Sequence, residues 1–206
     1  MNEGDGKLNI IKEKNTEEAF EASKKAILRQ KIIIYPTDTL YGLGVNAIDE
    51  EMVRKIYEVK GREFDKKLSI IVSDFEMLKR FCIANEKQMS IAKKLLPGPF
   101  TLIFKIKYPL PFLEDTIAVR IPKRDFITYL VRNLGFPITA TSANITGEKE
   151  PTEIDEICDD VFLAAEVVID GGKLPGKPST MIDLVDWKIV REGEGIELAN
   201  KALGEA

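Results

Sequence analysis

The sequence has 206 residues, of which 44% are hydrophobic and 31% are charged, and its formal net charge is −4. This composition is typical of folded proteins, not of disordered or fibrous ones, and the negative charge argues against a dedicated nucleic-acid coat protein. Histidine is absent, which excludes Ser-His-Asp and Cys-His catalysis and histidine zinc sites.

The cysteines and the N-terminus indicate where the protein works. Cys82 and Cys158 form neither a CxxC pair nor a disulfide framework, which favours a reducing compartment. The polar, acidic N-terminus lacks the apolar region of a signal peptide, and no apolar run approaches the ~20 residues that span a bilayer. We therefore expect a cytoplasmic protein without a membrane segment.

Strand-like and helix-like stretches alternate along the chain, as in an α/β or α+β domain. In chain order, we predict a strand over 8–12, a helix over 16–30, a strand over 31–35, a helix over 50–60 with Asp49 as its cap, and a strand over 69–72. Helices over 75–81 and 86–96, strands over 101–107 and 116–121, a helix over 125–133 and a strand over 138–141 follow. The last predicted elements are a helix opening at 151–152, strands over 167–170, 180–184 and 188–191, and a helix from 196 onward. We predict one domain over residues 1–206.

The first segment that could carry chemistry is the loop 36–44, PTDTLYGLG, after the buried-type strand 31–35. Its hydroxyls and glycines allow a polar ligand to approach at the carboxyl end of a strand. The alternative is a tight turn in which Thr37 and Asp38 bond their own backbone. The glycines at 42 and 44 fit a dinucleotide-binding spacing, but PTDTLY separates them from the strand, so we reject a nicotinamide site.

Two further loops contain groups that bind anions. Residues 60–67 contain four cations and two acids, and suit phosphate binding. Alternatively, Lys60 and Arg62 stabilise the end of the preceding helix. Residues 139–144, TATSAN, offer hydroxyl and amide donors after a strand. The competing interpretation is a helix cap made by Ser142 or Asn144.

The last candidates are a loop and a strand arginine. Residues 171–180 combine glycines and prolines with lysines and hydroxyls, which again indicates an anion-binding loop. Arg120 ends an apolar strand and therefore needs an acceptor. Its partner is either an internal carboxylate or the carboxylate of a ligand.

Taken together, these segments resemble the YrdC-like threonylcarbamoyl-AMP synthase family in its short, single-domain form. The matching segments are YPTDTLYGLG at 35–44, KGR at 60–62, LLPGPFTL at 95–102, TIAVRIP at 116–122, TSAN at 141–144, IDGG at 169–172 and PSTMID at 178–183. The resemblance covers about residues 16–193, between a polar N-terminus and a C-terminal tail that we expect to be helical. The family's usual Gly-x-Pro-Ser-type loop reads Gly-Glu-Lys-Glu at 147–150 here.

The resemblance implies a fold and a reaction. The fold is a single twisted, open-sheet YrdC-like α/β domain, with an α+β-like mixed sheet around a deep basic cavity. The enzyme is a nucleotidyltransferase, an L-threonylcarbamoyladenylate synthase. Threonine's amine captures bicarbonate or CO2, and the resulting carbamate attacks the α-phosphate of ATP, giving pyrophosphate and threonylcarbamoyl-AMP. This chemistry depends mainly on positioning and charge stabilisation, so it does not require histidine.

The resemblance also implies partners. ATP is a substrate, expected with Mg2+, and no tightly bound cofactor or dedicated metal site is expected. A tRNA threonylcarbamoyl transferase, of the KEOPS type or its bacterial counterpart, then modifies adenosine 37 of tRNA.

Site residues follow from the motifs that match. The L-threonine contacts are Thr37, Arg120, Ala140 and Ser179. The ATP contacts are Lys60, Arg62, Lys66, Thr116, Ser142, Asn144 and Arg191. Within these sets, the catalytic residues are Lys60, Arg62, Ser142 and Asn144.

The alternative function is a non-catalytic module that binds tRNA or double-stranded RNA. The net charge of −4, the single tryptophan and the lack of an RNP-type stacking motif argue against it. Weak tRNA binding is compatible with either function. Binding to a phosphate backbone should weaken steeply with salt, whereas threonine-dependent ATP turnover should not need RNA.

Overall fold

The computed structural model describes residues 9–63, 67–110, 113 and 115–204. The strands are β1 (Asn9–Lys12), β2 (Ile32–Pro36), β3 (Tyr41–Gly44), β4 (Ser69–Ile71), β5 (Cys82–Ile83), β6 (Phe100–Ile106), β7 (Thr116–Arg120), β8 (Ile138–Ser142), β9 (Ala165–Asp170), β10 (Thr180–Asp183) and β11 (Lys188–Arg191). The helices are α1 (Thr16–Leu28), α2 (Glu50–Val59), α3 (Phe75–Phe81), α4 (Glu86–Leu95), α5 (Asp125–Leu134), the 3-10 turn η1 (Ile154–Glu156), α6 (Asp159–Leu163) and α7 (Ile196–Gly204).

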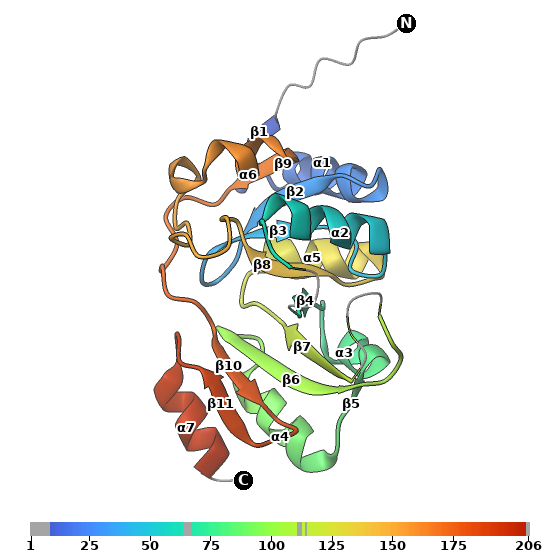
Figure 1. Ribbon diagram of the computed structural model, residues 1–206, viewed down its shortest axis with the longest axis vertical. Coiled ribbons are helices and arrows are strands. Elements are labelled where there is room, and N and C mark those ends of the chain that lie inside the picture. Colours follow the sequence, from blue (N-terminus) through green and yellow to red (C-terminus); the bar gives the residue numbers. More distant parts are fainter. Residues whose placement is uncertain (1–8, 64–66, 111–112, 114, 205–206) are drawn as a thin grey trace, which may run out of the picture.

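The strands form one mixed sheet in the order β1-β9-β2-β3-β8-β4-β7-β6-β10-β11, with β5 paired to β6. The pairs β1–β9, β9–β2, β4–β7 and β6–β10 are parallel, and the other neighbours are antiparallel. Figure 1 shows the strands following one another along the long axis, with α1, α2 and α5 near β2, β3 and β8, and with α4 and α7 near β10. The predicted mixed α/β sheet is confirmed.

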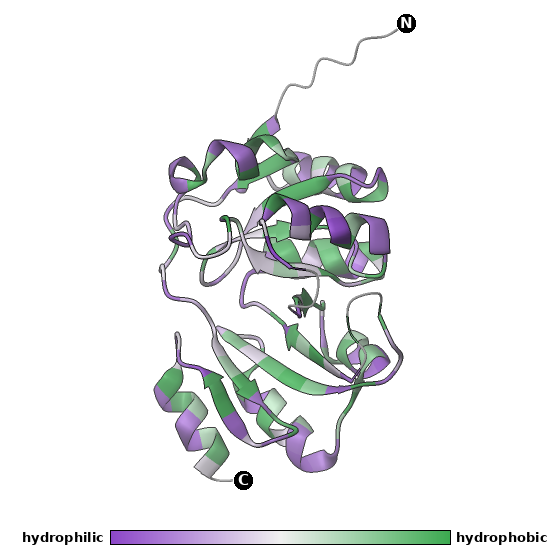
Figure 2. Ribbon diagram, viewed as in Figure 1, coloured by the Kyte–Doolittle hydropathy of each residue, from purple (hydrophilic) through white to green (hydrophobic). Residues whose placement is uncertain are grey.

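Burial explains why the central strands form. Every residue of β2 is buried, as expected for a β-branched run covered on both faces. Tyr35, Tyr41 and Phe104 are among the largest fully buried side chains. Each large apolar side chain that leaves water contributes about 1.5–3 kcal/mol to the stability of the fold. These buried side chains place the hydrophobic core along the central strands. In Figure 2 the strands are mainly hydrophobic, and the helices carry hydrophilic stretches.

Helix α2 determines the position of Lys60. Its predicted cap is present, because the Asp49 side chain accepts a hydrogen bond from the Met52 backbone N–H. Met52, Val53 and Ile56 are buried along one face, which fixes the rotation of the helix about its axis. Gly61 follows with a φ of +55°, a backbone conformation that favours glycine and turns the chain after Lys60.

Three regions differ from the prediction, and one of them is β5, a short strand that was not predicted. The segment Tyr41–Gly44, which we expected to be part of a loop, is strand β3 and pairs with β2. A Cβ at Gly42 would lie 2.9 Å from the Tyr35 ring, and one at Gly44 would lie 2.7 Å from it, so these glycines make room for Tyr35. The helix expected from 151–152 is reduced to η1, and α6 begins only at Asp159. The Glu156 carboxylate accepts hydrogen bonds from the Thr152 N–H and hydroxyl.

Among the described residues, no helix combines the length and the hydrophobicity that crossing a bilayer requires.

Candidate active site

A cavity of about 580 Å³ opens where β2, β4, β7, β8 and β10 meet the end of α2. Its lining includes nine residues that the sequence analysis selected: Thr37, Lys60, Arg62, Arg120, Ala140, Ser142, Asn144, Ser179 and Arg191. Residues separated by more than 150 positions in the sequence are therefore brought together in one hollow. Its lining contains the cations Lys60, Arg62, Lys67, Arg120 and Arg191, and the acids Glu148 and Glu150.

Two selected residues are not part of this lining. Lys66 lies outside the described residues. Thr116 is not a lining residue, but its hydroxyl accepts a hydrogen bond of 2.8 Å from Lys67 Nζ, and Lys67 lines the cavity. Thr116 is therefore one side chain away from the cavity wall.

The first group of polar contacts, which we call the lysine cluster, consists of Lys60, Ser142 and Asn144. Lys60 Nζ donates to Ser142 O at 2.6 Å, to Asn144 O at 2.7 Å and to Asn144 Oδ1 at 3.2 Å. Ser142 Oγ also donates to Asn144 Oδ1 at 2.6 Å. The ammonium group thus joins the end of α2 to the end of β8.

These contacts bear on the alternative roles of this region. The Lys60 ammonium donates to the end of β8 and its neighbouring loop, whereas the Lys60 backbone forms the C-cap of α2. Ser142 is the last residue of β8, and the Asn144 side chain bonds Lys60, Ser142 and the Glu148 carbonyl. Neither side chain caps a helix.

Burial changes the chemistry of Lys60, whose exposure is 3%. Its pKa is lowered from 10.5 to about 8, first by burial and then by the neighbouring Arg62 charge, while Glu150 and Cys158 act in the opposite direction. Arg62 Nη2 donates to the Lys67 carbonyl at 2.9 Å, but its Nε is buried and has no acceptor among the described residues. A buried donor without an acceptor is costly, so this wall favours an anionic ligand.

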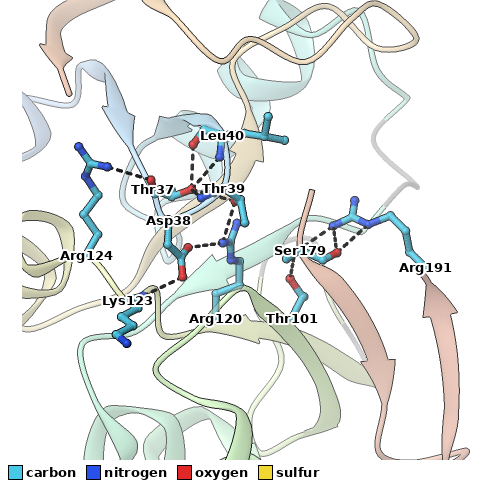
Figure 3. Close-up of polar contacts among 10 residues, drawn as sticks. All are labelled: Thr37, Asp38, Thr39, Leu40, Thr101, Arg120, Lys123, Arg124, Ser179 and Arg191. Carbon is cyan, nitrogen blue, oxygen red and sulfur yellow. Dashed lines mark hydrogen bonds and ion pairs between the residues drawn. The ribbon is translucent and has the colours of Figure 1, made fainter. Parts of the chain in front are cut away.

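The second group, the arginine cluster, consists of Asp38, Thr39 and Arg120 (Figure 3). Arg120 Nη2 donates to Asp38 Oδ1 at 2.8 Å and to Thr39 Oγ1 at 3.0 Å. The side chains of Arg120 and Asp38 are only 12% and 11% exposed. Arg120 therefore has an internal carboxylate partner, yet its buried Nε has no acceptor within the described part of the chain.

The loop before β3 holds this cluster in place. Thr37 Oγ1 accepts from the backbone N–H groups of Thr39 and Leu40 and donates to the Leu40 carbonyl. The Thr37 hydroxyl therefore makes the tight turn, and Thr37 also lines the cavity. The tight-turn alternative is wrong for Asp38, whose carboxylate accepts from Arg120 and from the Lys123 backbone N–H. Arg124, paired with the Glu13 carboxylate, donates to the Thr37 carbonyl from the other side.

The third group, the serine cluster, consists of Thr101, Ser179 and Arg191 (Figure 3). The hydroxyls of Thr101 and Ser179 lie 2.7 Å apart. Arg191 Nη2 donates to Ser179 Oγ and to Ser179 O, each at 3.0 Å. Burial lowers the pKa of Arg191. Arg191 thus fixes Ser179 at the cavity wall, besides lining the cavity itself.

Four residues in or beside these clusters were not predicted as ligand contacts. Asp38, Thr39, Lys67 and Thr101 all lie within segments that it singled out, but their partners are distant in the sequence. A threonine inside the apolar strand β6 was the available signal for Thr101.

Across the described ranges, no group of three or more His, Cys, Asp or Glu side chains is arranged to hold a metal ion.

Comparisons with known proteins support the same grouping of segments. A family model for Sua5, YciO and YrdC proteins, described as telomere recombination, matches residues 25–193. A Methanocaldococcus jannaschii protein, provisionally named a threonylcarbamoyl-AMP synthase, is 42% identical over 92% of this chain and 92% of its own length. The Pyrococcus abyssi threonylcarbamoyl-AMP synthase is 36% identical over 95% of this chain and 60% of its own length.

Solved structures agree with the sequence matches. The crystal structure of P. abyssi Sua5 complexed with L-threonine superposes with a TM-score of 0.88 at 35% identity, covering 96% of this chain and 61% of that one. Escherichia coli YciO superposes with a TM-score of 0.80 at 26% identity, covering 91% of this chain and 94% of that one. By the extent of these matches, the chain belongs to the Sua5/YciO/YrdC family.

Proposed function

We propose that this protein is an L-threonylcarbamoyladenylate synthase. It forms threonylcarbamoyl-AMP and pyrophosphate from L-threonine, bicarbonate or CO2, and ATP, and so supplies the N6-threonylcarbamoyladenosine modification at position 37 of tRNA. The observation that carries the proposal is that one cavity is lined by the lysine cluster and by Arg120 and Thr39 of the arginine cluster. The relatives named threonylcarbamoyl-AMP synthases and the threonine complex of P. abyssi Sua5 support it.

In this proposal the arginine side of the cavity binds L-threonine. Arg120 lines the cavity, and its planar guanidinium suits the substrate carboxylate. Thr37, Ala140 and Ser179 line the cavity with it and contribute polar contacts and shape. The substrate amine is then free to react with bicarbonate or CO2.

The lysine side binds ATP and carries out the adenylyl transfer. The carbamate oxygen forms a bond with the α-phosphorus, and the bond from that phosphorus to the oxygen bridging to the β-phosphate breaks, releasing pyrophosphate. Lys60 and Arg62 stabilise the negative charge that moves onto the leaving group, and Ser142 and Asn144 hold Lys60 in place. Lys66, Thr116 and Arg191 complete the proposed nucleotide contacts.

The remaining parts of the proposal concern context. Mg2+ accompanies ATP, with no dedicated protein site and no tightly bound cofactor. The product passes to a tRNA threonylcarbamoyl transferase, and the protein works in the cytoplasm as a single YrdC-like unit, surrounding a deep basic cavity. Both cysteines are free, which suits a reducing compartment.

A test of the proposal measures pyrophosphate release from ATP by the purified chain without RNA. We expect release that requires L-threonine and bicarbonate together and that falls to background when either is omitted from a CO2-depleted buffer. Release that ignores both omissions would overturn the proposal. A chain without turnover that binds tRNA with a steep dependence on salt would instead favour the RNA-binding module.

A further inference from the structure

Arg120 is oriented from outside the cavity by Asp38. The two N–H groups of Arg120 Nη2 are both used, one by Asp38 Oδ1 at 2.8 Å and one by Thr39 Oγ1 at 3.0 Å. What remains of the guanidinium is Nη1 and Nε, and Nε is buried without an acceptor among the described residues. The pair with Asp38 therefore determines which edge of Arg120 is available to a ligand.

Asp38 itself is not among the residues that line the cavity, whereas Thr37, Thr39 and Arg120 are. Its carboxylate is fixed at both oxygens, because Oδ1 accepts from Arg120 and Oδ2 accepts from the Lys123 backbone N–H at 2.9 Å. The Lys123 contact anchors the carboxylate to the segment that follows β7, the strand that contains Arg120. Asp38 therefore makes no direct contact with a ligand in the cavity, and its contact with Arg120 is the route by which it can orient one.

We propose that Asp38 is a positioning residue for substrate recognition: by holding Nη2 of Arg120, its carboxylate fixes the orientation in which the guanidinium lines the cavity and meets the carboxylate of the amino-acid substrate. The inference rests on the proposed function, because it takes an amino acid as the ligand of Arg120. It adds a residue that acts through another and does not touch the substrate.

Two effects of Asp38 on a bound carboxylate oppose each other. Its negative charge repels the ligand, and its contact with Arg120 restricts the guanidinium to one orientation. The second effect dominates, because the adjacent Arg120 charge largely offsets that of Asp38, while a long side chain without this contact loses its preferred orientation.

The test is Asp38→Asn in the full chain. An asparagine offers one oxygen, so its amino group must face either Arg120 or the Lys123 N–H, both of which are donors. We expect L-threonine to bind at least tenfold more weakly by titration calorimetry, and ATP to bind within twofold of the wild type. Asp38→Glu, which keeps both acceptors on a longer side chain, should recover part of the loss.

Asp74→Asn is the matched control. Asp74 also accepts from a backbone N–H, that of Met77, and also lies near an arginine, Arg132, but it is not a cavity residue. This variant should leave threonine binding unchanged. In an Arg120→Lys background, Asp38→Asn should have less than a twofold further effect on threonine binding, because the side chain that it positions is already replaced.

The outcomes separate the two proposals. If the wild-type chain binds no L-threonine, the proposed function fails before Asp38 is tested. If the wild type binds threonine and Asp38→Asn binds it equally or more tightly, the positioning role is overturned. An equal loss of threonine and ATP affinity, or a full effect of Asp38→Asn in the Arg120→Lys background, would also overturn it. Where Asp38→Asn does not fold, Asp38→Glu provides the same comparison between the two ligands.

Discussion

The lysine cluster and the arginine cluster both place a cation at the wall of one cavity, but they provide that cation with different partners. Lys60 donates to two backbone carbonyls and one amide oxygen, all of them neutral. Arg120 is paired with the Asp38 carboxylate. The positive charge is therefore uncompensated by direct contacts on the lysine side and mostly compensated on the arginine side.

This difference indicates which ligand suits each side. A buried cation without a carboxylate partner is unfavourable until an anion arrives, and the lowered pKa of Lys60 reflects that cost. A phosphate chain with several negative charges matches such a wall. A cation that already has a carboxylate partner can accept one more carboxylate without excess charge, which matches a zwitterionic amino acid.

The largest effect is expected from Lys60→Met, which removes the uncompensated charge. We expect kcat/KM for pyrophosphate release to fall by roughly 100- to 1,000-fold, the scale for losing one electrostatic contact to a transition state. Threonine binding should change little, because the arginine cluster is intact. The measurement is pyrophosphate release together with calorimetry of each ligand.

The control for the Lys60→Met experiment is the thermal stability of the variant. Methionine avoids the cost of burying a charge, but it leaves the carbonyls of Ser142 and Asn144 without their donor. Each effect is about 1–3 kcal/mol and they oppose each other, so we expect thermal unfolding to shift only slightly. Loss of turnover accompanied by loss of the folded state would contradict a role for Lys60 in binding the nucleotide.

The next effect is expected from Arg120→Lys, which keeps the charge on the compensated side but removes the planar fork. Lysine cannot bond Asp38, Thr39 and a ligand carboxylate with one fixed geometry. We expect threonine affinity to fall by roughly 10- to 100-fold, the scale for a lost charge-assisted hydrogen bond. ATP affinity should stay within about twofold; an equal loss for both ligands would break the division of the cavity into two sides.

The sequence carried more information about local elements than about these partnerships. The predicted bounds of α3 and β11 agree with the structure, because helix caps and β-branched runs act over a few residues. The strand β3 was missed, because its glycines indicate a loop unless the position of the Tyr35 ring is known.

The candidate site shows the same limit. Motif segments brought nearly all the expected residues to one cavity, because each segment flanks or forms a strand of the same sheet or, at Lys60 and Arg62, follows helix α2. The partner of Arg120 is 82 positions away, and that of Thr101 is 78 positions away. Pairings at such separations follow from sheet order and register, which local patterns do not specify.

The third prediction concerns pH. The pKa of Lys60 is lowered from 10.5 to about 8, first by burial and then by the nearby Arg62 charge. Above pH 8 the free protein therefore loses the charge that the nucleotide needs. Between pH 7 and pH 9 we expect the Kd for ATP to rise by about tenfold, since a pKa of about 8 leaves roughly one tenth of the chains protonated at pH 9. The threonine Kd should change less.

The sign for folding stability is opposite, which provides the control. Because the folded pKa of Lys60 lies below its unfolded value, the unfolded state binds more protons between about pH 8 and 10.5, and this residue makes stability rise with pH in that window. Lys60→Met should remove both trends. Equal pH dependence in Lys60→Met would assign the titration to another group.

The smallest effect is expected from Thr101→Val, which tests whether an uncharged contact can matter as much as the two charged clusters. The Thr101 hydroxyl is buried and lies 2.7 Å from Ser179 Oγ, so valine keeps the shape and removes one of the contacts that orient Ser179. Arg191 still donates to Ser179 Oγ, so we expect threonine affinity to fall only about threefold, with a stability loss of about 1 kcal/mol.

The control is Thr180→Val, at the neighbouring buried threonine. The Thr180 hydroxyl donates to Glu194 O and accepts from the Gly193 N–H, and Thr180 does not line the cavity. This variant should lower the unfolding temperature without changing the threonine Kd measured by calorimetry. If Thr101→Val weakened threonine binding as strongly as Arg120→Lys, the arginine cluster would no longer be the dominant determinant of this side, and the contrast between charged and uncharged contacts would fail.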